Sequence, residues 1–320
     1  MRDDVIYGCL YPDDKNIYKS IDNGKSVTFL QSFPDKVKSI FITSQNSIFV
    51  CVKGAVYKSS DSGNSFKKVL ELGSPISFFR HNNGMTETPN NTLIIAEYGN
   101  IWENNTWRKL AFLYYSFDGG DSWERSEFLI DKGTNKHAHL VKYSIALNKI
   151  FMADGDNKKK LWISDPILSS EHEPKWELVN KFHIQMGGYT SIVENDGKIL
   201  LGTDYQGGTN FLVETRDGKN FEKRIMPDPY RRSPIINMVQ RKSKRGTEIW
   251  AYLPYSTSNT KCLLMYSTND GESWNSLIEY RKGSHKIWLA SSSNEPVENL
   301  YFYIEDIKNN NRVVYRIDDL

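Results

Sequence analysis

A few side chains capable of chemistry stand beside runs of apolar, strand-like sequence. His137 and His139 are two residues apart, so on a strand they would share one face, where such a pair serves as base and orienter or as metal ligands. Arg231 and Arg232 suit a carboxylate, sulfate or phosphate, because a guanidinium group donates paired hydrogen bonds. Tyr189 follows two glycines, which let the backbone approach a ligand closely. These residue types favour recognition of an anionic, polar ligand.

Further acids, phenols and one histidine occupy equivalent places along the chain. Asp154 and Asp156 flank a glycine, a pattern that fits a cation-binding turn or a tight hairpin loop. No metal ion and no cofactor is expected. The other candidate ligand-binding residues are Glu97, Tyr98, Asp204, Tyr205, Tyr255 and His285.

The elements that would position these residues are separated by a repeated turn. Its best copy lies within Tyr114-Tyr-Ser-Phe-Asp-Gly-Gly-Asp-Ser-Trp123, directly after an apolar run. The Asp118 carboxylate can accept hydrogen bonds from nearby backbone N–H groups, Gly120 can adopt positive φ, and Trp123 can fold back over the turn. The pattern predicts a hairpin between two antiparallel strands.

Further copies of the turn follow at blade-like spacing. Asp61 lies in a copy that matches in full, and Asp22 lies in one with Val27 at the aromatic position. Asp217 lies in a copy one residue shorter, and Asn269 replaces the aspartate in a fifth. Two degenerate echoes occur at Asp165 and Asp318. Successive copies are 39, 57, 47, 52, 52 and 49 residues apart, about the length of a four-stranded propeller blade. The spacing predicts seven blades, with six as the alternative.

These turns match the Asp-box (BNR) repeat, so the chain resembles the sialidase-like β-propellers over nearly its full length. The resemblance implies an all-β fold of four-stranded antiparallel blades, in which the boxes are structural and lie away from the active site. An Arg-Ile-Pro motif of the family is absent, since the corresponding strand is Lys38-Ser-Ile-Phe-Ile. True sialidase activity is therefore not expected.

Alternation of apolar and polar residues predicts the strands within each blade. The third blade is expected at 75–80, 92–97, 112–116 and 123–129, the first blade lacks an inner strand, and the last lacks an outer one. Because antiparallel strands alternate in direction, the starts of first strands and the ends of second strands lie on one face, opposite the repeated turns. The candidate residues would then face one axial funnel.

Composition supports one domain over residues 1–320. Lysine and arginine number 41 against 39 acids, a net charge of +2 that favours neither nucleic acid nor a membrane surface as partner. The basic run 241–245 is expected in a solvated turn. Cys9, Cys51 and Cys262 are expected as buried small hydrophobes, and the aromatic content of 13% suits strands and sugar stacking.

Localisation is left open by the sequence. The chain has no run of 18 apolar residues and no signal-peptide core at its start, so membrane insertion is not expected. The alternatives are a protein that is not exported by that route and an extracellular or cell- or virion-surface protein whose export segment was removed or whose export is non-classical.

The predicted function is recognition of a carbohydrate, an acidic polysaccharide or glycan, in the funnel. One alternative is a polysaccharide lyase, in which Arg232 neutralises the sugar carboxylate, His137 removes the proton beside it and Tyr189 protonates the leaving oxygen. This set resembles the His/Tyr/Arg set of ulvan lyases, which are similar in blade number. A second is a glycoside hydrolase using Asp154 or Asp156 with Asp204 or Glu97. A third is a non-catalytic interaction or phage or cell-surface recognition propeller. The oligomeric state is not predicted.

Overall fold

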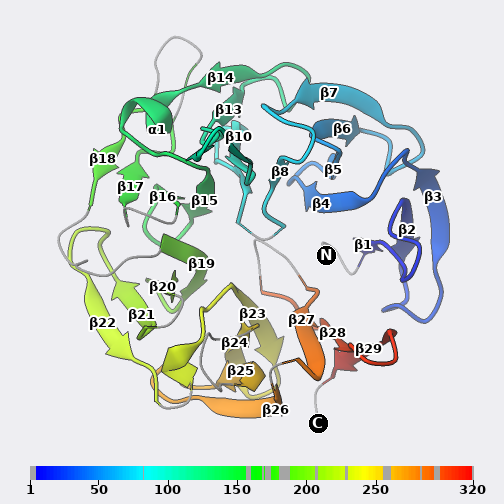
Figure 1. Cartoon of the computed structure of the whole chain (residues 1–320), viewed down its shortest axis with the longest axis vertical. Helices are drawn as coiled ribbons and strands as arrows, with labels where there is room; N and C mark the ends of the chain where they lie inside the picture. The colour runs from blue at the N-terminus through cyan, green and yellow to red at the C-terminus, as the bar shows by residue number, and fades with distance from the viewer. Residues whose placement is uncertain are drawn as a thin grey trace. The chain divides into compact units, whose positions relative to one another are not determined.

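Antiparallel strands make up almost all of the regular structure (Figure 1). The computed structural model describes residues 5–81, 83–155, 160–167, 169, 174–179, 188–205, 208–227, 230–254, 261–281, 283–291 and 296–318. Within these ranges the helical elements are one four-residue α-helix, α1 (Phe128–Asp131), and one 3₁₀ turn, η1 (Tyr230–Arg232). The all-β prediction is confirmed.

Seven blade sheets follow one another along the described chain, and an eighth sheet, of two strands, is inserted within the third of them. The first is β1 (Ile6–Gly8), β2 (Asn16–Ser20) and β3 (Thr28–Ser32), and the second is β4 (Val37–Ile42), β5 (Ile48–Val52), β6 (Ala55–Ser59) and β7 (Lys67–Glu71). The third contains β8 (Phe78–Phe79), β9 (Met85–Glu87), β10 (Leu93–Tyr98), β13 (Leu113–Ser116) and β14 (Glu124–Ser126).

The remaining four sheets continue the pattern. The fourth is β15 (Ala138–Ser144), β16 (Lys149–Asp154), β17 (Leu161–Ser164) and β18 (Glu177–Leu178), and the fifth is β19 (Gly188–Asn195), β20 (Lys198–Asp204), β21 (Phe211–Thr215) and β22 (Glu222–Ile225). The sixth is β23 (Asn237–Ser243), β24 (Gly246–Leu253), β25 (Lys261–Ser267) and β26 (Asn275–Arg281), and the seventh is β27 (His285–Leu289), β28 (Leu300–Asp306) and β29 (Asn311–Ile317). Seven sheets, with three strands in the first and last, agree with the seven-bladed prediction.

The chain divides into two compact units, and each is described by itself below. One contains residues 1–143 and 148–179, and the other contains 144–147 and 180–320. The first four blades belong to the first unit, apart from the last residue of β15, and the last three to the second. The prediction of a single domain over 1–320 is not tested by this division and stays a prediction.

The third blade departs most from its predicted strands. Its first strand, expected over 75–80, is split into β8 and β9, which pair with opposite ends of β10. A tight turn separates the two pieces: the Gly84 N–H donates to the Arg80 carbonyl at 2.8 Å, and a Cβ on Gly84 would lie 2.0 Å from the Arg80 nitrogen. The last predicted strand, 123–129, ends early because α1 begins at Phe128.

The repeated turns form one hydrogen-bond network in five places. In the copy between β6 and β7, Ser59 Oγ donates to Asp61 Oδ1 at 2.7 Å, and the Gly63 N–H donates to Ser59 Oγ at 2.8 Å. The N–H and hydroxyl of Ser65 both donate to the Asp61 carboxylate. These hydrogen bonds, from Ser65 first and then Ser59, lower the pKa of Asp61 to about 2. Equivalent networks surround Asp22, Asp118, Asp217 and Asn269.

The two degenerate echoes are held differently. The Asp165 carboxylate accepts a hydrogen bond from Lys149 Nζ at 2.5 Å, and Asp318 is paired with Arg316.

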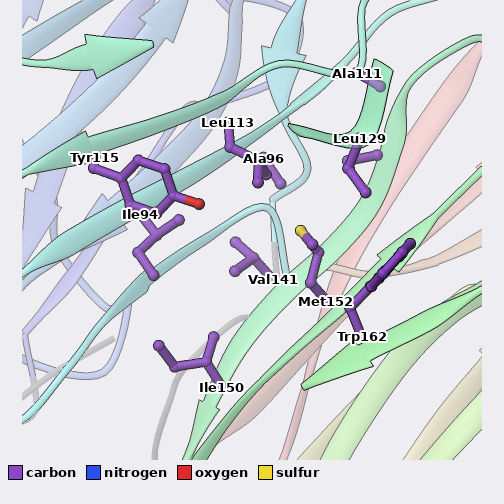
Figure 2. Packing of buried hydrophobic residues seen from close by; sticks show 11 residues of the cluster. Ile94, Ala96, Ala111, Leu113, Tyr115, Leu129, Val141, Ile150, Met152 and Trp162 are labelled. Atoms are coloured by element: carbon purple, nitrogen blue, oxygen red, sulfur yellow. The ribbon is translucent and has the colours of Figure 1, made fainter. Parts of the chain in front are cut away.

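Buried apolar side chains fill the spaces between neighbouring sheets. In the first unit, Ile94 of β10 and Leu113 of β13 belong to one cluster with Val141 of β15 and Met152 of β16 (Figure 2). Each of these four side chains is fully buried. Burial of a side chain of this size contributes about 1.5–3 kcal/mol, so this cluster fixes the third blade against the fourth. That packing sets the position of the strand ends described next.

Two further expectations concern burial and membranes. Cys51 and Cys262 are buried free thiols, as predicted, whereas Cys9 is half-buried. None of the helices in the described part of the chain has the length and hydropathy needed to span a bilayer.

Candidate functional site

The strand pairing places three of the candidate residues, Tyr98, Asp204 and His285, at strand ends. The start of each first strand lies beside the end of the second: Phe78 is paired with Tyr98, Gly188 with Asp204, and His285 with Asp306. Within each blade, the antiparallel register therefore determines which residues lie side by side at the strand ends.

The imidazole rings of His137 and His139 are hydrogen-bonded to each other at the start of the fourth blade. His137 Nδ1 lies 2.9 Å from the Gly99 carbonyl oxygen, and its Nε2 lies 3.1 Å from His139 Nε2. A carbonyl oxygen only accepts, so His137 Nδ1 carries a proton; in the neutral ring its Nε2 then accepts from His139 Nε2–H. Both side chains are buried, with 0% and 2% exposure. The pair is internal, held to the third blade through Gly99.

Tyr98 is the half-buried member of this cluster and connects it to the surface. Its ring lies 4.0 Å from the His137 ring and 5.2 Å from the Phe78 ring, measured between centroids. The Arg80 guanidinium carbon lies 5.6 Å from the Tyr98 centroid, within the range of a cation–π contact. The Asn100 amide donates to the Tyr98 hydroxyl at 3.4 Å. Phenol, guanidinium and amide groups thus meet at one blade end.

Asp154 is the last residue of β16 and is 1% exposed. Its carboxylate accepts from Thr134 Oγ1 at 2.8 Å and from the Lys160 N–H at 3.0 Å, and Lys160 Nζ lies 3.9 Å away. Burial raises the pKa of Asp154 to about 6, against the lowering effect of the Thr134 and Lys160 hydrogen bonds and of the Lys160 and His139 charges. Gly155 follows, and a Cβ there would lie 3.1 Å from His137 Cδ2. The acid and the imidazole pair are therefore packed together.

Asp154 makes stability pH-dependent in a predictable direction. A carboxyl whose folded pKa is raised from 3.8 to about 6 stabilises the fold below pH ~4, and this contribution is lost as pH rises through 6. Asp154→Asn removes the charge, while its Oδ1 can still accept from the Lys160 N–H and its Nδ2 can donate to Thr134 Oγ1. The decrease in unfolding free energy between pH 5 and 7.5 should therefore shrink by about 1 kcal/mol. Urea unfolding at both pH values measures this. Asp131→Asn, at an exposed position, should leave the pH difference unchanged; an unchanged difference in Asp154→Asn would contradict the prediction.

Glu97 has a different environment from the one expected of a ligand-binding residue. It is fully buried and accepts from the Gly73 N–H at 3.0 Å and from the Tyr114 hydroxyl at 2.7 Å. Burial raises its pKa, against the hydrogen bonds that lower it. Because neighbouring residues of a strand point to opposite faces, Glu97 points away from the face of Tyr98. Its described contacts connect the second blade to the third, and its buried side chain is not available to a ligand at the surface.

The second unit holds the other predicted residues. Tyr189 is 1% exposed, and burial raises the pKa of its hydroxyl. Asn210 is hydrogen-bonded to the backbones of both Tyr205 and Arg231. Its side-chain amide donates to the Tyr205 carbonyl and accepts from the Tyr205 N–H, and its backbone N–H donates to the Arg231 carbonyl. Arg231 is half-buried, and Arg232, at the end of η1, is exposed.

Three predicted residues remain. His285 stacks on Tyr280 with centroids 4.0 Å apart and lies at the start of β27. Asp156 and Tyr255 lie outside the described residues. The combination of His137 with Tyr189 and Arg232 in one site draws on both units and stays a prediction. No group of three or more His, Cys, Asp or Glu side chains in the described ranges is placed to hold a metal ion.

The sequence interpretation missed a hairpin that lies beside this cluster. β11 (Trp102–Glu103) and β12 (Thr106–Trp107) form a two-stranded sheet inserted between β10 and β13. Asn104 and Asn105 both have positive φ, 51° and 58°, as a type I′ turn requires. The signal was present in the sequence, because two Asn residues flanked by Trp-Glu and Thr-Trp are typical of such a turn.

Comparisons with known proteins identify a fold and no closer relationship. No protein-family model matches the chain, and no curated protein matches it. Among solved structures, the chain is similar to an ancestral GH74 enzyme, with a TM-score of 0.54, 16% identity, and coverage of 97% of this chain and 44% of that one. It is also similar to a chain of the mitotic checkpoint complex, with a TM-score of 0.60, 11% identity, and coverage of 98% and 84%.

A third similar structure is the extracellular domain of a candidate one-component system from B. thetaiotaomicron, with a TM-score of 0.58, 10% identity, and coverage of 98% and 38%. The chain thus spans less than half of this protein and of the GH74 enzyme. Together with the seven sheets, these similarities define the chain as an all-β, seven-bladed β-propeller. Identities this low concern the fold alone.

Proposed function

We propose that this chain is a carbohydrate-recognising propeller of the Asp-box, sialidase-like type, which binds an acidic polysaccharide or glycan at the blade ends around Tyr98. The observation that carries the proposal is the grouping of the Tyr98 ring, the Arg80 guanidinium and the Asn100 amide at the end of β10. An aromatic face suits the C–H face of a sugar, and a guanidinium suits its carboxylate or sulfate. The glycoside hydrolase neighbour is compatible with this function but only through its fold.

Assignment of the five repeated turns as Asp boxes rests on two facts. Their residues match that repeat, and each turn has the same network of a hydroxyl, a glycine N–H and an aspartate carboxylate, with the Asn269 amide in place of the carboxylate in the fifth. The turns connect third to fourth strands, whereas Tyr98 ends a second strand, at the opposite end of the blade. On this proposal the turns stabilise the blades and leave binding to the other face.

Binding is favoured over cleavage by the state of the imidazole pair. His137 and His139 are buried and hydrogen-bonded to each other, so in this arrangement neither exposes a base to a polymer. If the chain is instead a lyase or a hydrolase that acts at the same blade ends, the product analysis below would detect the fragments.

The test combines binding and product analysis on a panel of polysaccharides. Polygalacturonate, alginate and hyaluronan are compared with neutral dextran and xyloglucan by affinity gel electrophoresis, and the incubated polymers are analysed by mass spectrometry. We expect retardation by one of the acidic polymers, weakened at least tenfold in Tyr98→Ala and Arg80→Ala and unchanged in the exposed control Lys67→Ala. Absence of binding to any polymer, or equal binding by all variants, would refute the proposal.

Product masses decide between binding and chemistry. Fragments one water lighter than hydrolysis products would indicate elimination, and His137→Ala and Arg232→Ala should then be inactive. Fragments carrying the added water would indicate hydrolysis by the carboxylates. Intact polymer with Tyr98-dependent binding is the result that we expect.

A further inference from the structure

The β11–β12 hairpin has a rigid backbone and an exposed aromatic surface. Trp102 is paired with Trp107 and Glu103 with Thr106 across the type I′ turn, and the Arg108 N–H donates to the Ile101 carbonyl at 2.9 Å. The Trp102 and Trp107 rings meet edge to face, with centroids 5.0 Å apart. No residue from 102 to 107 is buried, and Trp102 is 57% exposed. Core packing therefore does not account for these two tryptophans.

Cationic groups surround this aromatic pair. Lys136 Nζ lies 4.0 Å from the Trp107 ring centroid, a close cation–π contact. Arg108 and Lys109 follow the hairpin and are exposed, whereas Glu103 is the one acid between residues 101 and 110. With Lys136 counted, three positive charges stand against one negative charge. The local field favours an anionic ligand, even though the whole chain is nearly neutral.

The hairpin is continuous with the cluster around Tyr98. The strand β10 ends at Tyr98, four residues before Trp102, and the intervening Gly99 carbonyl is bonded to His137 Nδ1. On the other side of the hairpin, the Leu110 N–H donates to the Lys136 carbonyl at 2.5 Å. The two ends of the insertion are thus tied to the adjacent residues Lys136 and His137. Because the hairpin directly follows Tyr98 in the sequence, an extended ligand bound at Tyr98 would next meet the tryptophan pair.

We propose that Trp102, Trp107 and Lys136 form a stacking subsite for one anionic pyranose unit of the bound carbohydrate. This inference rests on the proposed function, and it assigns the acidic preference to particular residues. The C–H groups of a pyranose face carry partial positive charge and pack on the electron-rich face of an indole. Lys136, placed over one of the two rings, supplies the countercharge for a carboxylate or sulfate on the same unit. The rigid turn fixes both rings before binding, which lowers the entropy cost of association.

The test uses single substitutions in the full chain with the acidic polymer that the panel identifies and with its hexasaccharide. Trp102→Ala should weaken binding at least tenfold by calorimetry, Trp102→Phe should recover most of the affinity, and Lys136→Met should weaken binding several-fold and reduce its dependence on salt. Phe29→Ala, at another exposed aromatic, is the control and should bind as the wild type does. Thermal unfolding should be unchanged in Trp102→Ala, because the hairpin has no buried residue.

The outcomes separate this inference from the proposed function. If Tyr98→Ala abolishes binding while Trp102→Ala and Lys136→Met bind as the wild type does, the hairpin subsite is refuted and the carbohydrate function stands. If Trp102→Ala weakens neutral and acidic polymers equally and Lys136→Met has no effect, the anionic assignment is refuted. If the wild type binds no polymer, the proposed function and the subsite both fail.

Discussion

Gly120→Ala is expected to lower the free energy of unfolding by about 3 kcal/mol, because two penalties coincide at this position. Gly120 has a φ of +93°, which a residue with a Cβ adopts only at a cost. An added Cβ would also lie 2.3 Å from Phe49 Cζ and 2.5 Å from Phe49 Cε1. Phe49 is fully buried in β5 of the preceding blade and cannot move away freely.

The neighbouring residue provides a matched control for this prediction. Gly119 also has positive φ, +72°, but an added Cβ there would have no atom within 4 Å. Gly119→Ala should therefore cost only about 1 kcal/mol, the backbone contribution alone. Urea unfolding of both variants separates the two penalties. Phe49→Leu in the Gly120→Ala background should recover part of the loss, and equal effects of the two glycine substitutions would show that Phe49 does not constrain the turn.

The sequence predicts the conformation of these turns but not what they touch. Spacing and residue type are enough to predict the hydrogen bonds of the turn, because those bonds join residues within six positions of one another. The contact between Gly120 and Phe49 joins residues of different blades. A Cβ on Gly63 would similarly lie 2.6 Å from Leu30 Cδ1, in β3. In these two copies the turn thus packs against the blade before it, a role that no local pattern reveals.

The candidate site shows the same division between local and tertiary information. Strand direction was enough to predict that Tyr98, His137, His139 and Asp154 gather at blade ends, because antiparallel pairing fixes which ends meet. It was not enough to predict burial. His137, His139 and Asp154 are fully or almost fully buried; Gly155 packs against His137, and Thr134 and Lys160, from two different connections, donate to Asp154. Such connections have no alternation of apolar and polar residues from which their position could be predicted.

The basic run 241–245 illustrates the limit for charged residues. It was expected in a solvated turn, and Lys242, Lys244 and Arg245 are exposed as predicted. For Arg241 the prediction was wrong, because β23 continues to Ser243 and places its side chain in the interior, with 3% exposure. The cause is its cross-strand partner: Arg241 is opposite Glu248 in the register, and a buried arginine is stable only beside such a partner.

Removing the charge of Arg241 is therefore expected to have the largest effect on stability in the second unit. Arg241 Nη1 lies 3.0 Å from Glu248 Oε2, and its Nε donates to the Glu298 carbonyl at 3.0 Å. Trp250 Nε1 donates to the same Glu248 oxygen at 2.9 Å. Arg241→Met would leave the buried Glu248 carboxylate without its counterion, which typically costs about 3–5 kcal/mol.

A second substitution distinguishes loss of the ion pair from loss of packing. Arg241→Met combined with Glu248→Gln removes both charges, and glutamine can still accept from Trp250 Nε1, so the double variant should recover at least half of the lost stability. Lys68→Met, which breaks the exposed Lys68–Glu71 pair, should change stability by less than about 0.5 kcal/mol. Urea unfolding of the wild type, Arg241→Met, Glu248→Gln and the double variant completes the cycle, with Lys68→Met as the control. If Arg241→Met alone costs no more than the Lys68 control, Glu248 keeps its charge through other contacts and the buried pair does not stabilise the sixth blade.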